Sequence, residues 1–425
     1  MLTRYLGNKT ELLPTILSAV ERAARPGALV CDAFAGTLAV SLALKRRGFR
    51  VAANDINLLS AVYGRAHLLP SEIPAVPLAD LVEDPDDVRA RATADVAALR
   101  GKPGFAFLRD HADRYIDVVA ALRALEDAPP GPRRDIYDHY CEAGARSHFT
   151  SSRGRQGRRR FFSEDNAHRI DAMLGQLRLW RGERGLSDPL YSLLLCVLLE
   201  GIERVANTQG TYHDFPREEW DPRALRPLRL APPPLDDLVA GGQHLLGSEE
   251  DSLEFIRRVP PHDVLYIDPP YNFRQYTAYY FLPNLFCRYA EIDDLDAYFA
   301  GVRFVRGQNP SDDFTSPFCS KEHFLEALAT LVGRARARTV ILSYFDGRNH
   351  WNEFKADGNG VGYRKLADFF SSSRFVSGSL EIVPMARQNY QSYGGHKARQ
   401  VQEYLFIARK ARGIAQAADT REVLC

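Results

Sequence analysis

Residues Val264-Leu-Tyr-Ile-Asp-Pro-Pro-Tyr271 decide the fold that we predict for this chain. Four apolar or aromatic residues run without a charge and stop at Asp268, a pattern typical of a short strand buried in a parallel sheet. Two prolines then end the strand, because neither can donate a hydrogen bond to a neighbouring strand. Asp268 is therefore expected at the carboxyl end of a central strand, where open α/β sheets bind ligands. A strand that simply ends in a proline-rich turn is the alternative.

Two further strands of the same sheet are predicted near the N-terminus. The apolar run 28–32 ends at Asp32 and passes through a glycine-containing turn, 33–38, that opens a helix through Leu44. A second apolar run, 50–55, ends at Asp55. Strand, glycine turn, helix and a strand that ends in an acid make up the nucleoside-binding half of a Rossmann-like sheet.

The rest of the sheet is predicted from hydrophobic periodicity. Amphipathic helices are expected over 13–20 and 321–336, where apolar residues recur every three or four positions. A strong strand follows at 339–345, and 380–385 and 403–408 are expected to form an antiparallel pair of last strands.

The apolar pattern changes between the strand at 50–55 and the strand that ends at Asp268. Helices are expected at 113–125, after an N-cap at Ser163, and over the apolar stretch 188–205. We therefore predict an α/β fold in which residues 1–70 and 245–410 form one discontinuous sheet domain. Residues 71–244 are a mainly helical insertion, and 411–425 are a frayed tail.

Composition narrows the classes of function. The 425 residues are 45% hydrophobic and 26% charged with a net charge of +1, so any nucleic-acid surface must come from local clustering. The six cysteines form no Cys-x-x-Cys pair, which fits a reducing cytoplasm. The longest apolar stretch, around 190–199, is shorter than the ~18 residues of a membrane span, so no membrane partner is expected. No metal is expected either, because the histidines lack metal-ligand spacing.

These motifs resemble a known family. Asp-Pro-Pro-Tyr at 268–271 resembles the catalytic motif of amino-group DNA methyltransferases, which methylate N6 of adenine or N4 of cytosine. The order of motifs is similar to that of Dam-type, adenine-specific DNA methyltransferases. Arg4-Tyr-Leu-Gly-Asn-Lys9 resembles the opening motif of that family, Asp32-Ala-Phe-Ala-Gly36 its cofactor loop, and Asn54-Asp-Ile-Asn57 the acid after its second strand. The resemblance spans about 1–70 and 160–410.

The resemblance implies a Rossmann-like S-adenosylmethionine-dependent methyltransferase sheet whose helical insertion recognises the target DNA. It implies that Asp55 takes the ribose hydroxyls and that Lys9 faces the methionine carboxylate of S-adenosyl-L-methionine. The residues that it assigns to the cofactor are Tyr5, Lys9, Asp32, Phe34, Gly36, Asp55, Ile56 and Asp268. One position departs from the family: Leu38 stands where a second glycine is usual, and its Cβ makes close approach of the cofactor harder.

The Asp-Pro-Pro-Tyr motif suits methylation of an exocyclic amine. Such an amine is a poor nucleophile because its lone pair is delocalised into the ring. Asp268 and the carbonyl of Pro269 could accept its hydrogen bonds, and Pro270 helps to hold that carbonyl in a fixed direction. Tyr271 could stack on the base, worth roughly 1–3 kcal/mol, which helps offset extrusion of the base from the duplex.

A basic stretch, 146–160, and the segments 207–212, 274–276 and 387–400 are candidates for DNA contact. The stretch is predicted to be a flexible Arg/Gly loop that orders on DNA, the alternative being a solvated loop. Residues 207–212 could equally form a plain helix C-terminal turn instead of a DNA contact. Residues 387–400 could equally form a solvated hairpin. The residues assigned to DNA are Arg153, Arg155, Arg158, Arg159, Arg160, Asn207, Tyr212, Arg274, Tyr276 and Lys397.

A narrower resemblance, to a subgroup of modification methyltransferases, rests on 160–171, 203–212 and 268–276. It implies a site-specific enzyme that methylates N6 of adenine in double-stranded DNA by base flipping, within a restriction-modification or related defence system. The implied partners are a cognate restriction endonuclease or defence-system subunits. Methylation of cytosine N4 stays open, as does a catalytically weak, DNA-binding subunit of a defence complex.

Overall fold

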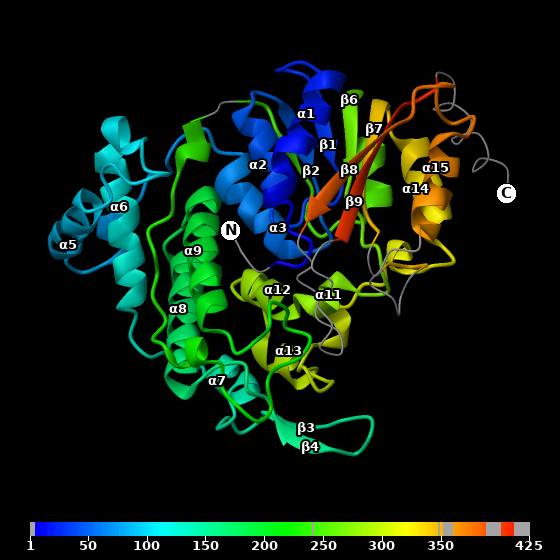
Figure 1. Cartoon of the computed structure of the whole chain (residues 1–425). Coiled ribbons are helices and arrows are strands. Elements are labelled where there is room, and N and C mark those ends of the chain that lie inside the picture. The colour runs from blue at the N-terminus through cyan, green and yellow to red at the C-terminus, as the bar shows by residue number, and fades with distance from the viewer. Residues whose placement is uncertain (1–4, 240–241, 347–348, 352–359, 388–400, 412–425) are drawn as a thin grey trace. The chain divides into compact units, whose positions relative to one another are not determined.

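The computed structural model of the chain describes residues 5–239, 242–346, 349–351, 360–387 and 401–411 (Figure 1). The chain folds into two compact units. The sheet unit consists of residues 7–56, 242–276 and 314–425, and the helical unit consists of residues 1–6, 57–241 and 277–313. The expected boundaries were 70 and 245. The structure divides the chain differently, because residues 57–70 and 277–313 pack with the helical unit.

The sheet unit is built on a seven-stranded sheet with the order β5-β2-β1-β6-β7-β9-β8. Neighbouring strands from β5 to β7 are parallel, whereas β9 is antiparallel to both β7 and β8. The predicted α/β sheet is therefore confirmed, including its antiparallel last pair. The strands are β1 (Leu29–Asp32), β2 (Arg50–Ala53), β5 (Leu245–Leu246), β6 (His262–Ile267), β7 (Ala337–Phe345), β8 (Glu381–Arg387) and β9 (Val401–Arg409).

Helices cover the two faces of this sheet. Residues of α10, α14 and α15 share one apolar cluster with alternate residues of β1, β6, β7 and β9, so these three helices lie on one face. Helix α1 contacts β6 and β7 but contributes nothing to that cluster, so it lies on the other face. The helices of the unit are η1 (Thr10–Leu12), α1 (Leu13–Ala23), α2 (Ala39–Arg46), α10 (Ser252–Arg258), η6 (Pro317–Cys319), α14 (Phe324–Arg334) and α15 (Val361–Phe370).

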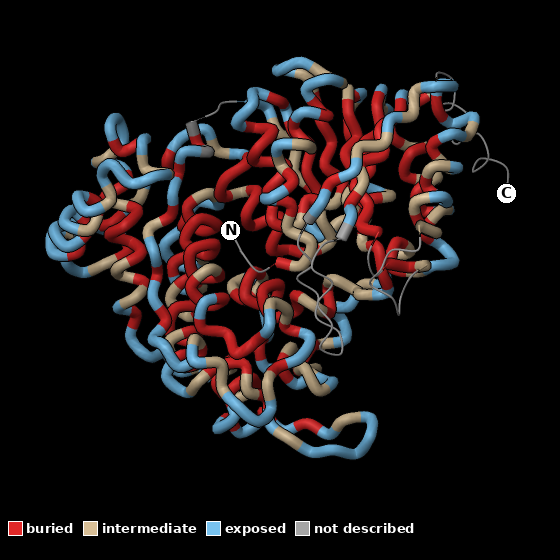
Figure 2. The backbone as a smooth tube through the Cα atoms, viewed as in Figure 1, coloured by how far each residue is buried: buried red, intermediate tan, exposed pale blue. Residues whose placement is uncertain are grey.

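Burial follows the predicted apolar pattern in the sheet unit. The four residues of β1 and the last four of β6 are all buried, as Figure 2 shows for the central strands. This explains why both strands appear in the sequence as unbroken apolar runs and not as alternating ones.

The helical unit is organised around α9 (Asp188–Val205), whose predicted bounds are confirmed and whose residues are buried on most sides. Helix α8 packs on α9 and also on α6 and α7. Ser163 occupies the N-cap position of α8 as expected, but its side chain makes no capping hydrogen bond. The other helices of the unit are α3 (Leu58–Tyr63), η2 (Gly64–Leu68), α4 (Leu78–Leu81), α5 (Pro85–Ala97), α6 (Leu108–Glu126), α7 (Asp135–Tyr140), α8 (Glu164–Glu183), η3 (Pro222–Leu225), η4 (Asp236–Val239), α12 (Phe281–Arg288), α13 (Leu295–Ala300) and η5 (Pro310–Asp312), with the short α11 (Tyr276–Tyr279) at its boundary.

The basic stretch contains a hairpin where a flexible loop was predicted. Strands β3 (His148–Thr150) and β4 (Gln156–Arg158) are antiparallel, and Phe149 pairs with Gly157. A Cβ at Gly157 would stand 2.7 Å from the Phe149 ring, so the ring occupies the space that a side chain would need. Residues 148–158 are called the arginine hairpin below.

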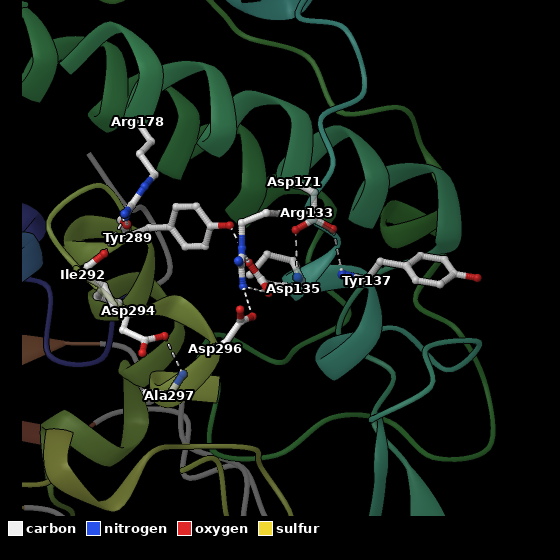
Figure 3. Close-up of polar contacts among 11 residues, drawn as sticks. Arg133, Asp135, Tyr137, Asp171, Arg178, Tyr289, Ile292, Asp294, Asp296 and Ala297 are labelled. Carbon is white, nitrogen blue, oxygen red and sulfur yellow. Dashed lines mark hydrogen bonds and ion pairs between the residues drawn. The ribbon is translucent and has the colours of Figure 1, made fainter. Parts of the chain in front are cut away.

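Polar contacts attach residues 277–313 to the helical unit (Figure 3). Arg178 on α8 donates hydrogen bonds to the carbonyls of Tyr289 and Ile292, both at 2.7 Å. The Tyr289 hydroxyl donates to Asp135 at 2.6 Å, and Arg133 pairs with Asp135 and with Asp296. These bonds explain why the segment after the Asp-Pro-Pro-Tyr motif leaves the sheet unit.

Among the described helices, none combines the length and the apolar character that crossing a bilayer requires.

Candidate active site

Three acids meet at one edge of the sheet, as the sequence predicted. Asp32 is the last residue of β1, Asp268 directly follows β6, and Asp55 lies two residues beyond β2. Because β1 pairs in parallel with both β2 and β6, the carboxyl ends of all three strands lie side by side. These three carboxylates are called the acidic edge below.

The turn after β1 is tied to the end of β2. The backbone N–H of Ala35 donates to the carbonyl of Asn54 at 2.8 Å, and that of Gly36 donates to a carboxylate oxygen of Asp55 at 2.9 Å. Gly36 has a φ of +51°, a conformation that glycine adopts without strain. The glycine turn thus fixes Asp55, whose side chain is half-buried, at the acidic edge.

Leu38 adopts the backbone conformation that a glycine would favour. Its φ is +63° and its ψ is 17°, in the left-handed region that costs an L-residue roughly 1–2 kcal/mol. Its side chain is fully buried, so apolar burial offsets that cost. At the position where the sequence departs from the family, the chain therefore has a strained turn at the start of α2.

Asp32 is buried within this edge. Its Oδ2 accepts a hydrogen bond of 2.7 Å from the hydroxyl of Ser41. The pKa of Asp32 is raised to about 7: burial is the main cause, the negative charges of Asp268 and Asp55 add to the rise, and the Ser41 hydrogen bond and the Phe34 amide oppose it. Half-buried Phe34 packs edge-on against Phe318 at 4.9 Å between ring centroids.

Lys9 lies between two carboxylates. Its Nζ is 2.8 Å from Oδ1 of Asp268 and 2.8 Å from Oε1 of Glu403 on β9. The Ser343 hydroxyl on β7 donates to the same Glu403 oxygen at 2.6 Å. Lys9 is 3% exposed and Glu403 is fully buried. These four residues, called the lysine cluster below, join the opening motif to the Asp-Pro-Pro-Tyr motif.

Sequence reasoning missed half of the lysine cluster. Glu403 and Ser343 were treated only as members of predicted strands. The available signal was a charged and a polar residue within two apolar runs, 403–408 and 339–345, where burial of charge needs a partner. Which partner it would be could not be known from the sequence.

Tyr271 packs into the protein interior. Its ring is 5% exposed and lies 5.3 Å from the Phe345 ring, with the Lys9 ammonium 5.7 Å from its centroid. Its hydroxyl and that of Tyr276 lie 3.6 and 3.5 Å from the place that a Cβ on Gly7 would take. A Cβ would therefore fit there at ordinary contact distance, and it is the φ of +82° that favours glycine at position 7.

The loop after Tyr271 is anchored by its polar groups. The backbone N–H of Arg274 donates to the Asn272 side chain at 3.1 Å, and the Cys319 thiol donates to the Arg274 carbonyl at 3.1 Å. Arg274 and Tyr276 are half-buried, whereas Phe273 between the anchors is 53% exposed. Phe273 is a further surface aromatic that no motif in the sequence indicated.

Tyr5 belongs to the helical unit. Its ring stacks on Tyr280 at 4.2 Å with an interplanar angle of 16°, and its hydroxyl accepts a hydrogen bond from Asn57 at 3.3 Å. Ile56, the last residue of its segment in the sheet unit, is half-buried.

The predicted DNA-binding arginines divide into exposed and buried ones. Arg153, Arg155 and Arg158 are exposed on the arginine hairpin. Arg160 is half-buried, pairs with Glu142 at 2.9 Å and lies 5.0 Å from the centre of the Trp220 ring. Lys397 lies outside the described residues.

Arg159 is 4% exposed and serves the interior of the helical unit. Its guanidinium donates to four backbone carbonyls, those of His139, Arg146, Phe304 and Val305. A guanidinium held in this way cannot reach a phosphate without breaking those bonds, so we do not assign Arg159 to DNA.

Asn207 and Tyr212 are also buried. Asn207 is fully buried, donates to the Arg160 carbonyl at 2.9 Å and accepts from the Asp221 amide at 3.0 Å. Tyr212 is 4% exposed, and its amide donates to the Tyr279 carbonyl. These residues hold the segment after α9 in place, so we do not assign either of them to DNA.

Within the described part of the chain, no three His, Cys, Asp or Glu side chains are grouped as a metal site would require.

The sheet order and the acidic edge define the class of this protein: it has the Rossmann-like fold of S-adenosylmethionine-dependent methyltransferases. The model of the D12 class N6 adenine-specific DNA methyltransferases matches residues 5–300. The chain belongs to that family and is a DNA adenine methyltransferase. The expectation drawn from the Asp-Pro-Pro-Tyr motif and its order in the chain is thus confirmed, with adenine and not cytosine as the base.

The regions that align with this chain cover different shares of the curated relatives. The type II methyltransferase M.NlaIII of Neisseria lactamica is 28% identical over 344 residues, covering 80% of this chain and 82% of the relative. The modification methylase LlaI of Lactococcus lactis subsp. lactis is 29% identical over 286 residues, which are 67% of this chain and 38% of the relative. The type II methyltransferase M.FokI of Planomicrobium okeanokoites is 27% identical over 254 residues, 59% of this chain and 35% of the relative.

Proposed function

We propose that this protein transfers a methyl group from S-adenosyl-L-methionine to N6 of one adenine within a specific duplex sequence, after flipping that base out of the helix. The observation that carries the proposal is the ion pair of 2.8 Å between Lys9 and Asp268 at the end of β6. It joins the opening motif and the Asp-Pro-Pro-Tyr motif at one carboxylate.

The acidic edge suits a cationic cofactor. Oδ1 of Asp32 is buried, and the described residues give it no hydrogen bond that meets normal geometric limits. A buried carboxylate oxygen without such a bond favours a nearby cation or donor. Within the sheet unit, the residues that we assign to the cofactor are Lys9, Asp32, Phe34, Gly36, Asp55, Ile56 and Asp268. Tyr5 stays in this assignment from the family motif.

When bound, the cofactor supplies a methyl group on a sulfonium, which needs no further activation. Asp268 and the Pro269 carbonyl would accept hydrogen bonds from the adenine amino group and orient its lone pair toward that methyl group. Pro269 and Pro270 restrict the backbone, so the accepting carbonyl is fixed before the base arrives. Tyr271 would border the flipped base. The amino nitrogen would gain the methyl group as the bond from sulfur to that methyl breaks and leaves a neutral thioether, and it would lose one proton to water or Asp268.

Contact with double-stranded DNA is assigned to both units. In the helical unit the arginine hairpin presents Arg153, Arg155 and Arg158 to solvent, and half-buried Arg160 lies at its base. In the sheet unit Arg274 and Tyr276 follow the catalytic motif. Because the net charge is only +1, such local clusters would supply the electrostatic attraction to phosphates. The helical unit would thus read the target sequence.

The names of the relatives support a role in modification. Two of them are type II methyltransferases and one is a modification methylase. We therefore propose that the protein protects DNA beside a restriction endonuclease or within a related defence system.

The test is transfer from methyl-labelled S-adenosylmethionine to duplex DNA, followed by identification of the modified nucleoside. N6-methyladenine is expected, with the Asp268→Asn variant at least 1,000-fold slower because its amide cannot supply the same acceptor. N4-methylcytosine would overturn the choice of base. DNA binding without transfer would indicate a catalytically weak subunit and overturn the proposed reaction.

A further inference from the structure

We propose that Glu403 is a positioning residue of the methyl transfer: it holds the Lys9 ammonium in the orientation that in turn fixes the Asp268 carboxylate. This inference rests on the proposed function and assigns a residue outside the range 5–300 that the family model matches.

Glu403 is an unusual residue for its place in the sheet. It lies within β9, which runs between β7 and β8, and it pairs with Phe345 on one side and Met385 on the other. The residue is fully buried. An apolar side chain would satisfy the packing of an interior strand without removing a charge from water. A carboxylate at this position therefore needs a reason beyond packing.

The contacts of Glu403 supply that reason. Its Oε1 receives the Ser343 hydroxyl at 2.6 Å and lies 2.8 Å from Lys9, which fixes the carboxylate from two sides. Lys9 reaches Asp268 at the same distance of 2.8 Å. The ammonium charge therefore lies 2.8 Å from a carboxylate oxygen on each side, and Glu403 fixes its position relative to Oδ1 of Asp268. With Oδ1 held, the second oxygen of Asp268 is aimed as an acceptor for the adenine amine.

The charges of this region bear on the pH dependence. Lys9 faces Asp268 beyond β6, Glu403 on β9 and the Tyr271 ring. The Tyr266 hydroxyl on β6 is close enough to Asp268, Asp32 and Glu403 for their negative charges to raise its pKa, although burial is the larger cause. If Glu403 loses its charge, the buried ammonium loses one of the carboxylate charges that lie beside it among the described residues. It should then release its proton at lower pH, and Asp268 should lose its fixed orientation.

The decisive variant is Glu403→Gln, which keeps the size of the side chain and an oxygen for the Ser343 hydroxyl. We expect kcat to fall 10- to 100-fold with KM for both substrates within about threefold. The alkaline limb of the kcat profile should move to lower pH. Glu403→Asp, which restores the charge on a shorter side chain, should recover part of kcat and return the alkaline limb toward its original position. Tyr404→Phe, on the same strand, is the matched control and should leave kcat and the position of the alkaline limb unchanged.

A second readout needs neither cofactor nor DNA. The chain has eight lysines, so ¹³Cε-lysine labelling gives a small set of signals, and Lys9→Arg identifies the one from Lys9. In Glu403→Gln this signal should titrate at lower pH than in the natural protein, with the midpoint of thermal unfolding changed by less than about 3 °C.

Several outcomes would overturn the inference. Glu403 would be only a structural residue if kcat or the Lys9 titration were unchanged in Glu403→Gln. The same would follow if kcat fell equally at every pH together with a large drop in the unfolding midpoint. A rise in KM for S-adenosylmethionine alone would place it in cofactor binding. If the natural protein transfers no methyl group, the proposed function fails, and the lysine titration still decides whether Glu403 controls Lys9.

Discussion

Each unit holds a carboxylate within a polar cluster, and the two carboxylates differ in their partners. In the sheet unit, Asp268 pairs with the side chain of Lys9 at the end of a strand. In the helical unit, Asp171 on α8 accepts hydrogen bonds from the backbone amides of Ile136 and Tyr137, at 2.8 and 2.9 Å, at the start of α7 (Figure 3). Both oxygens of Asp171 are thus used to hold a helix end. The comparison teaches that the partners of a buried carboxylate indicate its role better than burial does.

A raised pKa does not distinguish a carboxyl group of the acidic edge from one with a structural role. Burial raises the pKa of Asp171 to about 7, opposed by the two backbone amides, and burial also raises the pKa of Asp32 to about 7. One carboxyl lies at the acidic edge and the other closes a structural network. A shifted pKa is therefore a pointer to a site only where the geometry also leaves room for a ligand.

The largest effect that would sharpen this contrast is expected for Asp171→Ala. It leaves two buried N–H groups without an acceptor, at about 1–3 kcal/mol each, so the free energy of unfolding should fall by roughly 2–6 kcal/mol. The midpoint of thermal unfolding should drop by about 5–15 °C in calorimetry. Asp268→Asn should change that midpoint little while abolishing transfer. If Asp171→Ala left stability intact and removed transfer, the distinction between the clusters would be wrong.

A matched control lies in the same network. Asp296 pairs with Arg133 at 2.8 Å, but its side chain is 84% exposed. Ion pairs at the surface contribute little, so Asp296→Ala should lower the midpoint by no more than about 2 °C.

The next effect concerns the exposed arginines of the helical unit. Replacing both Arg153 and Arg155 by Ala should weaken binding to duplex DNA about tenfold and reduce the slope of log Kd against log salt by about 1.8, since each phosphate contact contributes about 0.9. Fluorescence anisotropy at several salt concentrations measures both. The control is Arg91→Ala with Arg114→Ala, because these arginines pair with Asp127 and Glu72. Equal slopes for both double variants would exclude the arginine hairpin as a phosphate contact.

The smallest effect concerns Asp32. With a pKa of about 7 its carboxyl is mostly protonated below that pH and ionised above it. A cationic ligand favours the ionised form, so affinity for S-adenosylmethionine should rise by less than tenfold as the pH increases from 6 to 8. Calorimetric titration should also show proton release near pH 6–7. Asp32→Asn should remove both effects, and a pH-dependence that persists in this variant would assign the titration to another group.

Local patterns in the sequence were sufficient for much of the fold. The runs that became β1, β2 and β6 are short, apolar and ended by acids or prolines, so their strand character and the acidic edge follow from neighbouring residues alone. The bounds of α9 were equally readable, because Asp188-Pro189 starts an apolar stretch of helical length.

Only the tertiary structure decided which charged residues meet. Arg158 and Arg159 are neighbours in one basic stretch, yet the first is exposed and the second is buried against four carbonyls supplied in part by residues 304–305. Glu403 reaches Lys9 across nearly the whole chain because β9 lies beside β7 in the folded sheet. The physical reason is that a sequence pattern records the local period of apolar residues, whereas the partner of a buried charge depends on contacts between distant segments.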